Sequence, residues 1–328
     1  MDDTPDDGII TFADANVKAI CVANWDTDGD GELSMAEAAA VKDIGMLFYN
    51  NKKIKSFNEL QYFTGLTAIS QLAFLGNENM TSVVFPSNLT TIGKFAFASC
   101  THLQKADLTE GITSIGYQAF GGTSLTAVVI PSSLTYLDDG VYAMCNELRS
   151  ISVESGNTVY DSRGNCNAVI ETATNKLVQG CNTTVIPKNV TAIGSYALNA
   201  FDGITAVNLP ASVTAIGNYA YEECSKLTTV TIPAAVKSID EYAFYNCTAL
   251  NEVYSKINEP MAIDLSVFQT YSSYEGKKFT TATLYVPKGT KSKYKNTAGW
   301  KNFTTIIEMD FMDELKGDVN GDMGVDEA

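Results

Sequence analysis

The sequence predicts a repeat solenoid, a fold in which short units of chain stack on one another around a continuous core. Three observations lead to this prediction. A motif of 22 or 23 residues recurs along most of the chain, its apolar positions keep one spacing, and 45% of the 328 residues are hydrophobic. Such a composition supplies enough apolar side chain for a sizeable core and argues against long disorder.

One aliphatic position marks each copy of the motif. It is occupied by Ile69, Ile92, Ile115, Leu137, Ile193, Ile216 and Ile239, in steps of 23, 23, 22, 56, 23 and 23 residues. An aromatic residue or leucine follows five positions later with the same steps, at Phe74, Phe97, Phe120, Tyr142, Leu198, Tyr221 and Phe244. Two positions that keep step over seven copies indicate a true repeat.

Each unit reads L-x-x-V-x-I-P, then V-T-x-I-G, then x-x-A-F-x-x-C. The V-x-I alternation predicts a strand with one buried face, and the proline after it ends that strand because it lacks a ladder donor. The V-T-x-I segment predicts a second short strand. The glycine and the A-F-x-x-C segment are expected to turn the chain back through a helical or 3₁₀ turn. No unit can bury its apolar residues alone, so the units must stack.

The step of 56 residues contains one ordinary unit and one that is ten residues longer. The extra residues fall in NAVIETATNKLVQGC, at 167–181, which reads as a β-hairpin. Pairing Ile170 with Leu177 and Glu171 with Lys176 leaves 172–175 as its turn. We therefore expect a degenerate coil with a hairpin insertion at about 158–184.

These motifs resemble the leucine-rich repeats of the BspA-like bacterial surface-antigen family, also called the Treponema type. The resemblance covers about residues 45 to 307. It rests on FNELQYFTGLTAI at 57–69, the repeated IGxxAF, GNCNAVIETATNKLVQGC at 164–181 and LYVPKGTKSKYKNTAGWKNFTTIIEM at 284–309. It implies a right-handed leucine-rich-repeat solenoid displayed on a bacterial surface, with an adhesin-like or protein-binding role and no enzymatic activity.

The net charge of −16 is concentrated in short segments. Residues 1–50 hold 11 acids and 2 bases, residues 308–328 hold 8 acids and 1 base, and residues 276–307 hold seven lysines and no acid. Outside this lysine cluster the chain lacks the basic footprint of a nucleic-acid-binding protein. The lysines (Lys277, Lys278, Lys288, Lys291, Lys293, Lys295 and Lys301) fit a solvated helix face, or a contact with an acidic partner such as the tail that follows.

Four parts of the chain follow from these patterns. We expect a helical EF-hand-like N-terminal cap at 1–50, a solenoid at 51–260, a C-terminal cap at 261–309 and an acidic tail at 310–328. No apolar run approaches the roughly 18 residues of a membrane span. The N-terminus does not read as a signal peptide, so the chain is either cytosolic or without its export signal. The resemblance favours an extracellular or cell-surface location.

Residues 26–37 match the calcium-binding loop of an EF-hand. Asp26, Asp28 and Asp30 are expected to supply carboxylates, and Gly31 permits the sharp turn. The remaining ligands are the backbone carbonyl of Glu32, Ser34 directly or through water, and both carboxylate oxygens of Glu37. Because a single loop lacks the partner that makes a sensor, we expect a structural calcium site. The alternative is an acidic surface turn that binds nothing.

A second loop starts at residue 318 and resembles the first half of a dockerin-type calcium repeat. Asp318, Asn320 and Asp322 would be its ligands. Met323 replaces the usual turn glycine, and the sequence stops before the twelfth position, so we interpret this segment as truncated. A complete version would support a scaffold or recruitment role in which the solenoid is a spacer or targeting domain.

Two surface rows are candidate binding sites. Strand positions that face away from the core, including Asn208, Thr229 and Thr231, are small, mostly uncharged and suited to a partner or to solvent. The position before the repeat alanine holds Tyr196, Tyr219 and Tyr242, which would stack on successive coils and either dock a ligand or stabilise the stack. These rows suggest a protein or extracellular-matrix ligand, but the sequence predicts neither its identity nor the oligomeric state.

The seven cysteines and the single histidine argue against thiol and zinc chemistry. Cys100, Cys145, Cys224 and Cys247 recur at one repeat position and are expected in the core, as is Cys21. Cys166 and Cys181 flank the hairpin closely enough to form a disulfide in an oxidising compartment. His102 falls at a variable repeat position, where we expect it on the surface. No catalytic constellation emerges from the sequence, so we predict a binding protein.

Overall fold

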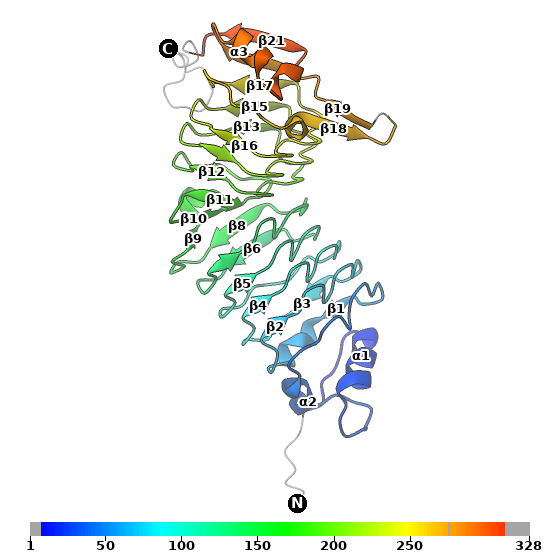
Figure 1. Cartoon of the computed structure of the whole chain (residues 1–328). Helices are drawn as coiled ribbons and strands as arrows, with labels where there is room; N and C mark the ends of the chain where they lie inside the picture. The colour runs from blue at the N-terminus through cyan, green and yellow to red at the C-terminus, as the bar shows by residue number, and fades with distance from the viewer. Residues whose placement is uncertain (1–7, 275, 312–328) are drawn as a thin grey trace, which may run out of the picture. The chain divides into compact units, whose positions relative to one another are not determined.

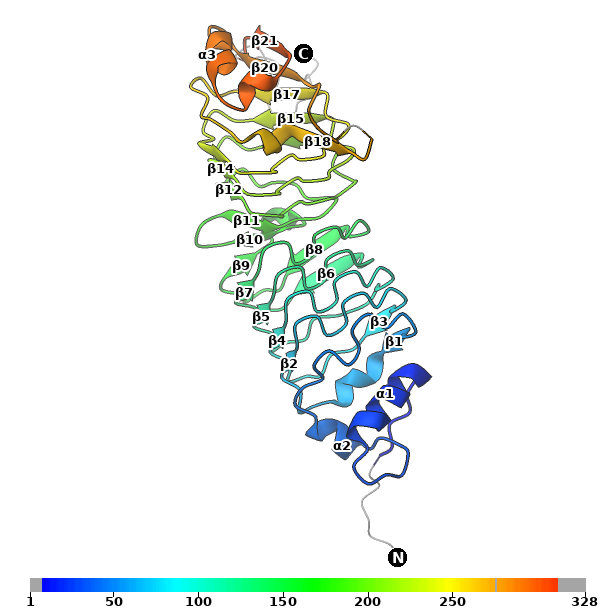
Figure 2. The same cartoon turned by 45° about the vertical axis from the view of Figure 1, so that its right-hand side comes forward.

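The computed structural model describes residues 8–274 and 276–311. The chain forms two compact units, one made of Met1–Pro187 with Gly194–Phe201, the other of Lys188–Ile193 with Asp202–Ala328. Each unit is a stack of coils with short strands along its sides (Figures 1 and 2). The predicted solenoid is thereby confirmed.

The first unit carries most of the helix in the described residues. Its helices are α1 (Ala15–Trp25), α2 (Met35–Ala40), the 3₁₀ helix η1 (Asn58–Tyr62) and the 3₁₀ helix η2 (Arg163–Asn165). Its strands are β1 (Ser56–Phe57), β2 (Ala68–Ile69), β3 (Ser82–Val83), β4 (Thr91–Ile92), β5 (Ser114–Ile115), β6 (Ala127–Ile130), β7 (Tyr136–Leu137), β8 (Ser150–Val153), β9 (Tyr160–Asp161), β10 (Val169–Glu171) and β11 (Lys176–Gln179).

The parallel sheets place the repeat positions in register. In the order β2–β4–β5–β7, Ile69 pairs with Ile92, Ile92 with Ile115 and Ile115 with Leu137. Strands β1 and β3 form a second parallel pair, and β6 and β8 a third. The prolines act as predicted, since β6 ends at the residue before Pro131.

The hairpin insertion has the predicted register. Ile170 pairs with Leu177 and Glu171 with Lys176 in the antiparallel pair β10–β11, and residues 172–175 form the turn. Strand β9 pairs with the other edge of β10. Arg163 ties the two parts together, because its guanidinium donates to both carboxylate oxygens of Asp161 and to Asn175 Oδ1.

The second unit is built mainly of parallel strands. Its strands are β12 (Ala192–Ile193), β13 (Ala206–Asn208), β14 (Ala215–Ile216), β15 (Thr229–Ile232), β16 (Ser238–Ile239), β17 (Glu252–Ser255), β18 (Gln269–Ser272), β19 (Gly276–Phe279), β20 (Thr283–Pro287) and β21 (Thr305–Met309). Its helical segments are η3 (Leu265–Phe268), α3 (Lys291–Asn296) and η4 (Trp300–Asn302). The antiparallel hairpin β18–β19 projects from this unit (Figure 1).

Stacked aromatic rings form the centre of each core. In the first unit, Phe74, Phe97, Phe120 and Tyr142 stack at centroid distances of 4.9, 5.3 and 5.5 Å, with rings nearly parallel. In the second, Tyr221, Phe244 and Phe268 stack at 5.2 and 5.4 Å. Such pairs contribute about 0.5–1.5 kcal/mol beyond the buried area, so the repeated aromatic position holds successive coils together.

The turns after the second short strand are not the helical or 3₁₀ turns that the sequence suggested. They contain two residues with left-handed backbone. The first position holds Leu72, Phe95, Gln118, Gly140, Tyr196, Tyr219 and Tyr242, and the second holds Gly76, Ser99, Gly122, Met144, Ala200, Glu223 and Asn246. The reason is hydrogen bonding between coils: the N–H groups of Phe97 and Ser99 donate to carbonyls of the next coil, both at 2.7 Å. These bonds offset the roughly 1–2 kcal/mol of a left-handed residue.

All seven cysteines are buried free thiols, as expected for the repeat position. The thiols of Cys100, Cys145 and Cys247 each donate to the carbonyl of the core aromatic residue one coil earlier, at 3.1 Å. Cys166 and Cys181 form no disulfide in this structure; their thiols face the carbonyls of Ala168 and Asn167 instead.

Candidate metal loop and binding surfaces

The loop 26–37 lies between two helices, as predicted. Helix α1 begins after Asp14, whose carboxylate accepts from the N–H of Asn16, and ends at Trp25. Helix α2 begins after Ser34, which forms a capping box with Glu37. Leu33 is fully buried, so the middle of the loop is anchored in the apolar interior.

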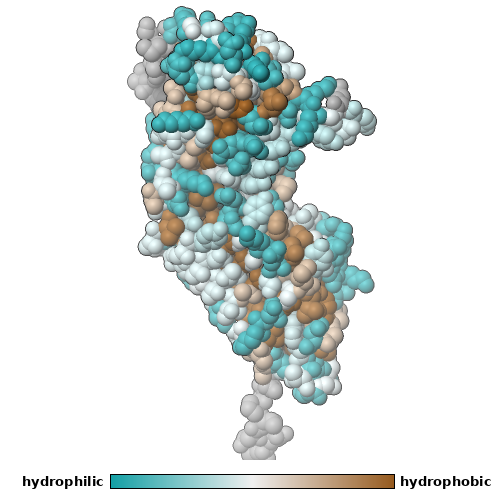
Figure 3. Space-filling view, in the orientation of Figure 1, coloured by the Kyte–Doolittle hydropathy of each residue, from teal (hydrophilic) through white to brown (hydrophobic). Residues whose placement is uncertain are grey.

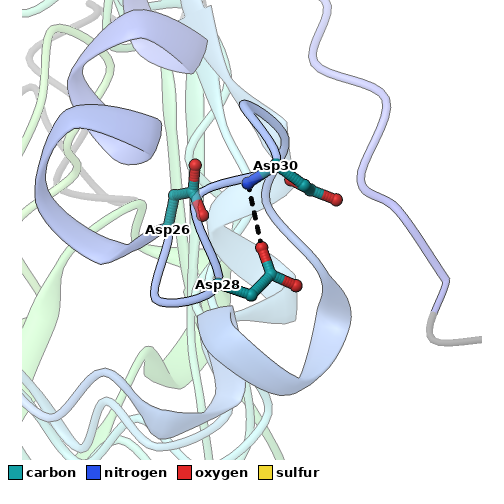
Figure 4. A group of neighbouring side chains, drawn as sticks. All are labelled: Asp26, Asp28 and Asp30. Atoms are coloured by element: carbon teal, nitrogen blue, oxygen red, sulfur yellow. Dashed lines mark hydrogen bonds between the residues drawn. The ribbon is translucent and has the colours of Figure 1, made fainter.

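Three carboxylates converge in the first half of the loop. Asp26, Asp28 and Asp30 each offer an oxygen within 4.8 Å of the others (Figure 4). Backbone N–H groups hold them in place: Gly29 and Gly31 donate to Asp26 at 2.7 and 2.9 Å, and Asp30 donates to Asp28 at 3.1 Å. The structure therefore brings together three of the six residues that the sequence predicted as ligands.

Two glycines allow the chain to turn so tightly. Gly29 and Gly31 have φ of 76° and 84°, which is the left-handed region that other residues rarely adopt. No atom lies within 4 Å of a Cβ placed on either of them, so the backbone conformation and not lack of space is what calls for glycine here.

The second half of the loop is arranged differently from the first. Glu37 lies outside the aspartate group; its carboxylate accepts from Thr27 N and Oγ1 and from Ser34 N and Oγ. These hydrogen bonds lower the pKa of the Glu37 carboxyl to about 2, and the bond from Ser34 N has the largest effect, followed by those from Thr27. The side chain of Glu32 pairs with Lys18 at 2.6 Å, which leaves its backbone carbonyl as the group that the sequence predicts as a ligand.

The electrostatics of the loop suit a cation. For Asp28, the hydrogen bond from Asp30 N lowers the pKa, but desolvation and the charges of Asp30 and Glu37 outweigh it and raise the pKa overall. A bound cation would relieve this repulsion. Oxygen ligands from carboxylates, a hydroxyl and a carbonyl match the preference of Ca²⁺. The donor set therefore fits calcium. To bind the ion, the carboxylate of Glu37 would have to give up hydrogen bonds that it accepts from Thr27 and Ser34. Asp318, Asn320 and Asp322 lie outside the described residues.

The predicted sheet face lies on the second unit. Its sheet runs β13–β15–β17–β20–β21. Asn208 pairs with Thr231 across β13 and β15, and Thr229 pairs with Glu252 across β15 and β17. Their side chains alternate with buried Val207, Val230 and Val253, which confirms the alternation read from the sequence.

The same face contains a tyrosine pair. Tyr254 stands at an outward-facing strand position that the sequence predicted, whereas Tyr285 was missed. Tyr254 and Tyr285 stack at 4.6 Å with rings 9° apart, in the row that continues from Asn208 and Thr231. The Tyr254 hydroxyl donates to Glu252 at 3.1 Å. Both tyrosines occupy the middle position of the strand motif, so extending that motif to 283–287 would have found Tyr285 as well.

The predicted tyrosine row contains a stacked pair. Tyr219 and Tyr242 stack at 4.8 Å with parallel rings, as predicted, and Tyr245 packs edge-on against Tyr242. In the first unit, Tyr196 packs edge-on against Tyr117 at 5.6 Å. The equivalent positions there include Leu72 and Phe95, which line a shallow apolar hollow of about 320 Å³ together with Leu75, Ala98, Ser99, Gln118, Gly121 and Met144.

A family model described as the BspA type leucine rich repeat region matches residues 67–174 and 171–284, with six copies. These residues make up more than half of the chain. The chain belongs to the BspA-type leucine-rich repeat family. Repeat proteins of this kind are typically binding scaffolds without catalytic activity, and leucine-rich repeats commonly bind proteins. No curated protein matches the chain.

Solved leucine-rich repeat structures share its fold. The pneumococcal vaccine antigen PcpA has 18% identity and a TM-score of 0.56 over 75% of this chain and 72% of that one. A leucine rich cell surface protein of Faecalibacterium prausnitzii has 19% identity and a TM-score of 0.52 over 88% and 80%. A leucine-rich repeat protein of Bacteroides ovatus has 18% identity and a TM-score of 0.52 over 93% and 68%.

The helices give no sign of a membrane span. Among residues 8–274 and 276–311, none combines the length and apolar character needed to cross a bilayer.

Proposed function

We propose that this BspA-type protein is a non-catalytic, extracellular or cell-surface binding protein that contacts a protein or matrix ligand through its solenoid. Two structurally similar proteins are named a vaccine antigen and a cell surface protein, which supports a surface location. The observation that carries the proposal is the face of the second unit's sheet, where Asn208, Thr229 and Thr231 lie beside Tyr254 and Tyr285.

This face has the composition of a protein-binding surface. Tyrosine gives a large rigid contact with few rotatable bonds, and short neutral side chains can adapt their hydrogen bonds. Because the strands underneath form one continuous parallel sheet, the face is preorganised and little entropy is lost when a partner binds. Its single acid in the central rows, Glu252, leaves it almost uncharged, so a ligand recognised mainly by charge is disfavoured.

The test is a binding array of extracellular-matrix proteins and glycans probed with the wild-type protein and two matched variants. Thr231→Arg places a long charged side chain in the middle of the face and should reduce binding at least about tenfold. Thr248→Arg makes the same change at an exposed turn of the same unit and should have no effect. Equal binding by both variants would exclude this face as the binding site.

A surface location can be tested separately. We expect intact cells of the source organism to show the protein to an antibody or to an added protease without lysis. Protection of the protein until the cells are opened would contradict the proposal.

We further propose that the loop 26–37 binds one structural calcium ion that stabilises the N-terminal helix pair. Asp26, Asp28 and Asp30 would supply carboxylates, with the Glu32 carbonyl, Ser34 and Glu37. Calcium supplies positive charge to these carboxylates, while the chain itself fixes the loop through Leu33 and the two helix caps. Ligand binding to the folded state alone raises stability by mass action.

Thermal unfolding with calcium and with chelator tests this site. Calcium should raise the melting temperature of the wild type and of Asp107→Asn, which removes an exposed acid elsewhere. It should not raise the melting temperature of Asp28→Asn/Asp30→Asn. An identical curve with and without calcium would exclude a structural ion.

A second candidate function, recruitment through a dockerin-like module, is favoured by the sequence GDVNGD at 317–322. Isothermal titration calorimetry with calcium tests whether this segment binds a metal ion. A second calcium ion per chain that disappears when residues 312–328 are deleted would support a metal loop at Asp318, Asn320 and Asp322. One ion per chain in both proteins would leave only the N-terminal site.

A further inference from the structure

The C-terminal part of the second unit presents a rigid face of lysines. Helix α3 carries Lys291, Lys293 and Lys295, η4 adds Lys301, and hydrophilic side chains gather over the region of α3 and β21 in Figure 3. Tyr294 and Trp300 hold these segments down: the Tyr294 hydroxyl donates to Ile257 O, and Trp300 Nε1 donates to Met261 O, both at 2.8 Å. The lysines are therefore displayed on a fixed scaffold.

The acids around this face neutralise only part of its charge. Lys288 pairs with Asp310 at 3.2 Å and Lys293 with Glu259, while Glu308 accepts from the backbone N–H of Lys291. The ammonium groups of Lys291, Lys295 and Lys301 form no ion pair in the part of the chain that the structure describes. Lys295 and Lys301 are exposed, and Lys291 is half-buried. Counting only residues 8–274 and 276–311, the face thus keeps an unbalanced positive charge.

The same chain carries a segment of opposite charge at its N-terminus. Residues 1–50 hold 11 acids against 2 bases, a net charge of −9. Asp28 and Asp30 are exposed there, so at least part of this charge is open to solvent. The net charge of −16 makes whole molecules repel one another, but salt screens this repulsion beyond the Debye length, which is about 10 Å at 0.1 M salt. Contacts at shorter range therefore depend on the local charges of the two surfaces.

We propose that the lysine face of Lys291, Lys295 and Lys301 binds the acidic N-terminal region, residues 1–50, of a second copy of this chain. The two surfaces differ, so the contact is heterologous: each copy that joins leaves one surface of each kind unused, and further copies can be added. Such self-association would make a binding protein multivalent and raise its avidity for a repeated ligand without any new ligand contact.

Analytical ultracentrifugation of the full chain over a range of concentrations tests this contact. At about 50 mM salt the sedimentation coefficient should rise with protein concentration, and at about 500 mM it should stay that of the monomer, because salt screens the contact. Lys291→Glu/Lys295→Glu/Lys301→Glu should weaken self-association by about tenfold or more. The control Lys105→Glu/Lys188→Glu/Lys226→Glu changes the net charge equally at other exposed lysines and should associate like wild type.

A mixing experiment separates the heterologous contact from a symmetric one. The lysine variant keeps its acidic region, so adding it to wild type should cap the growing chains and shorten them. A closed dimer that does not grow, a monomer at every concentration, or equal loss in the control variant would overturn the proposal. Monomeric wild-type protein that binds a sulfated polysaccharide column through the same three lysines would assign the face to a polyanion instead.

The effect of calcium on the self-association is a further test, and it rests on the proposed metal loop. An ion bound at Asp26–Glu37 would neutralise part of the acidic region, so calcium should weaken the association by a measurable factor. If salt and the lysine variant act as expected but calcium has no effect, the metal loop is wrong and the self-association stands. If calcium raises the melting temperature but the protein never associates, the calcium site stands and the self-association is wrong.

Discussion

The side chain of Tyr196 lies directly over Gly140, although 56 residues separate them. A Cβ placed on Gly140 would approach Tyr196 Cβ to 2.8 Å and Cγ to 3.2 Å. The two residues occupy the same turn position of consecutive turns, because the coil with the hairpin insertion does not reach this side: Met144 N donates to Asn199 O. The tyrosine therefore fills the space that the glycine leaves open.

Gly140→Ala should destabilise the first unit by about 2–5 kcal/mol. Alanine at φ of 61° is unfavourable by about 1–2 kcal/mol, and the contact with Tyr196 adds about 1–3 kcal/mol of overpacking. Gly164→Ala is the matched control, because Gly164 has φ of 64° but no atom within 4 Å of its added Cβ. It should lose only the backbone contribution. Equal losses in urea unfolding of the two variants would mean that Tyr196 does not pack on this site.

The side chain of Gln179 replaces a backbone hydrogen bond that is missing between the same two turns. In ordinary coils the core aromatic N–H donates to a carbonyl of the next coil, as Phe120 does to Val141. Tyr142 N instead donates to Gln179 Oε1 at 3.2 Å, and Gln179 Nε2 donates to Ala197 O at 3.3 Å. The amide of a fully buried glutamine thus stands in for a peptide group.

Gln179→Leu should therefore lower the free energy of unfolding by about 2–4 kcal/mol. It keeps the volume but leaves the N–H of Tyr142 buried without an acceptor, which costs about 1–3 kcal/mol, and it removes a donor to Ala197 O. Gln104→Leu, at an exposed position, is the control and should change little. A neutral result at residue 179 in chemical denaturation would show that water can take over these hydrogen bonds.

These two sites mark the limit of what the sequence predicts. The repeat period gave the coils, the parallel register of Ile69 with Ile92, and even the pairing of Ile170 with Leu177, because each depends on local spacing. The three aspartates of the metal loop followed from their spacing as well. Contacts that cross the irregular coil, such as that of Tyr196 with Gly140, have no periodic signal. The left-handed turns were missed because bulky residues such as Phe95 rarely adopt that conformation and are held there by bonds between coils.

Tyr142→Phe should stabilise the protein by about 1 kcal/mol. The hydroxyl of Tyr142 is fully buried and has no hydrogen-bond partner in the described structure, and burial raises its pKa strongly. Phenylalanine keeps the ring stack with Phe120 and removes the unpaired polar group. The melting temperature should rise by a few degrees in differential scanning calorimetry.

Tyr160→Phe is the opposite case and serves as the control. The Tyr160 hydroxyl accepts from Leu137 N at 3.0 Å, so its removal leaves a buried N–H unpaired. We expect a loss of about 1–3 kcal/mol. A loss of stability in both variants would indicate that the Tyr142 hydroxyl has a buried partner after all, for example an ordered water.

Asp14 joins the N-terminal helix pair to the first coil in a pH-dependent manner. Burial opposes the charged form, but hydrogen bonds from Lys55 N at 2.6 Å, Asn16 N at 2.8 Å and Asn16 Nδ2 at 3.0 Å prevail and lower the pKa below its usual 3.8. A lowered carboxyl pKa stabilises the folded state above pH 3.8, and this contribution disappears as the pH falls through the folded-state value.

Asp14→Asn should accordingly loosen helix α1 at pH 7 by about 0.5–2 kcal/mol, the usual range for an N-cap, because it weakens the cap and the bond to Lys55 together. Amide hydrogen exchange along α1 measures this local opening. Glu59, whose carboxylate accepts from Ala13 N at 3.0 Å, is present in both proteins and so does not contribute to the difference between them. The difference between wild type and variant should therefore narrow in acid, well below pH 3.8, where Asp14 is itself protonated. A difference that stays constant from neutral to acid pH would assign the effect to shape and not to the charge of Asp14.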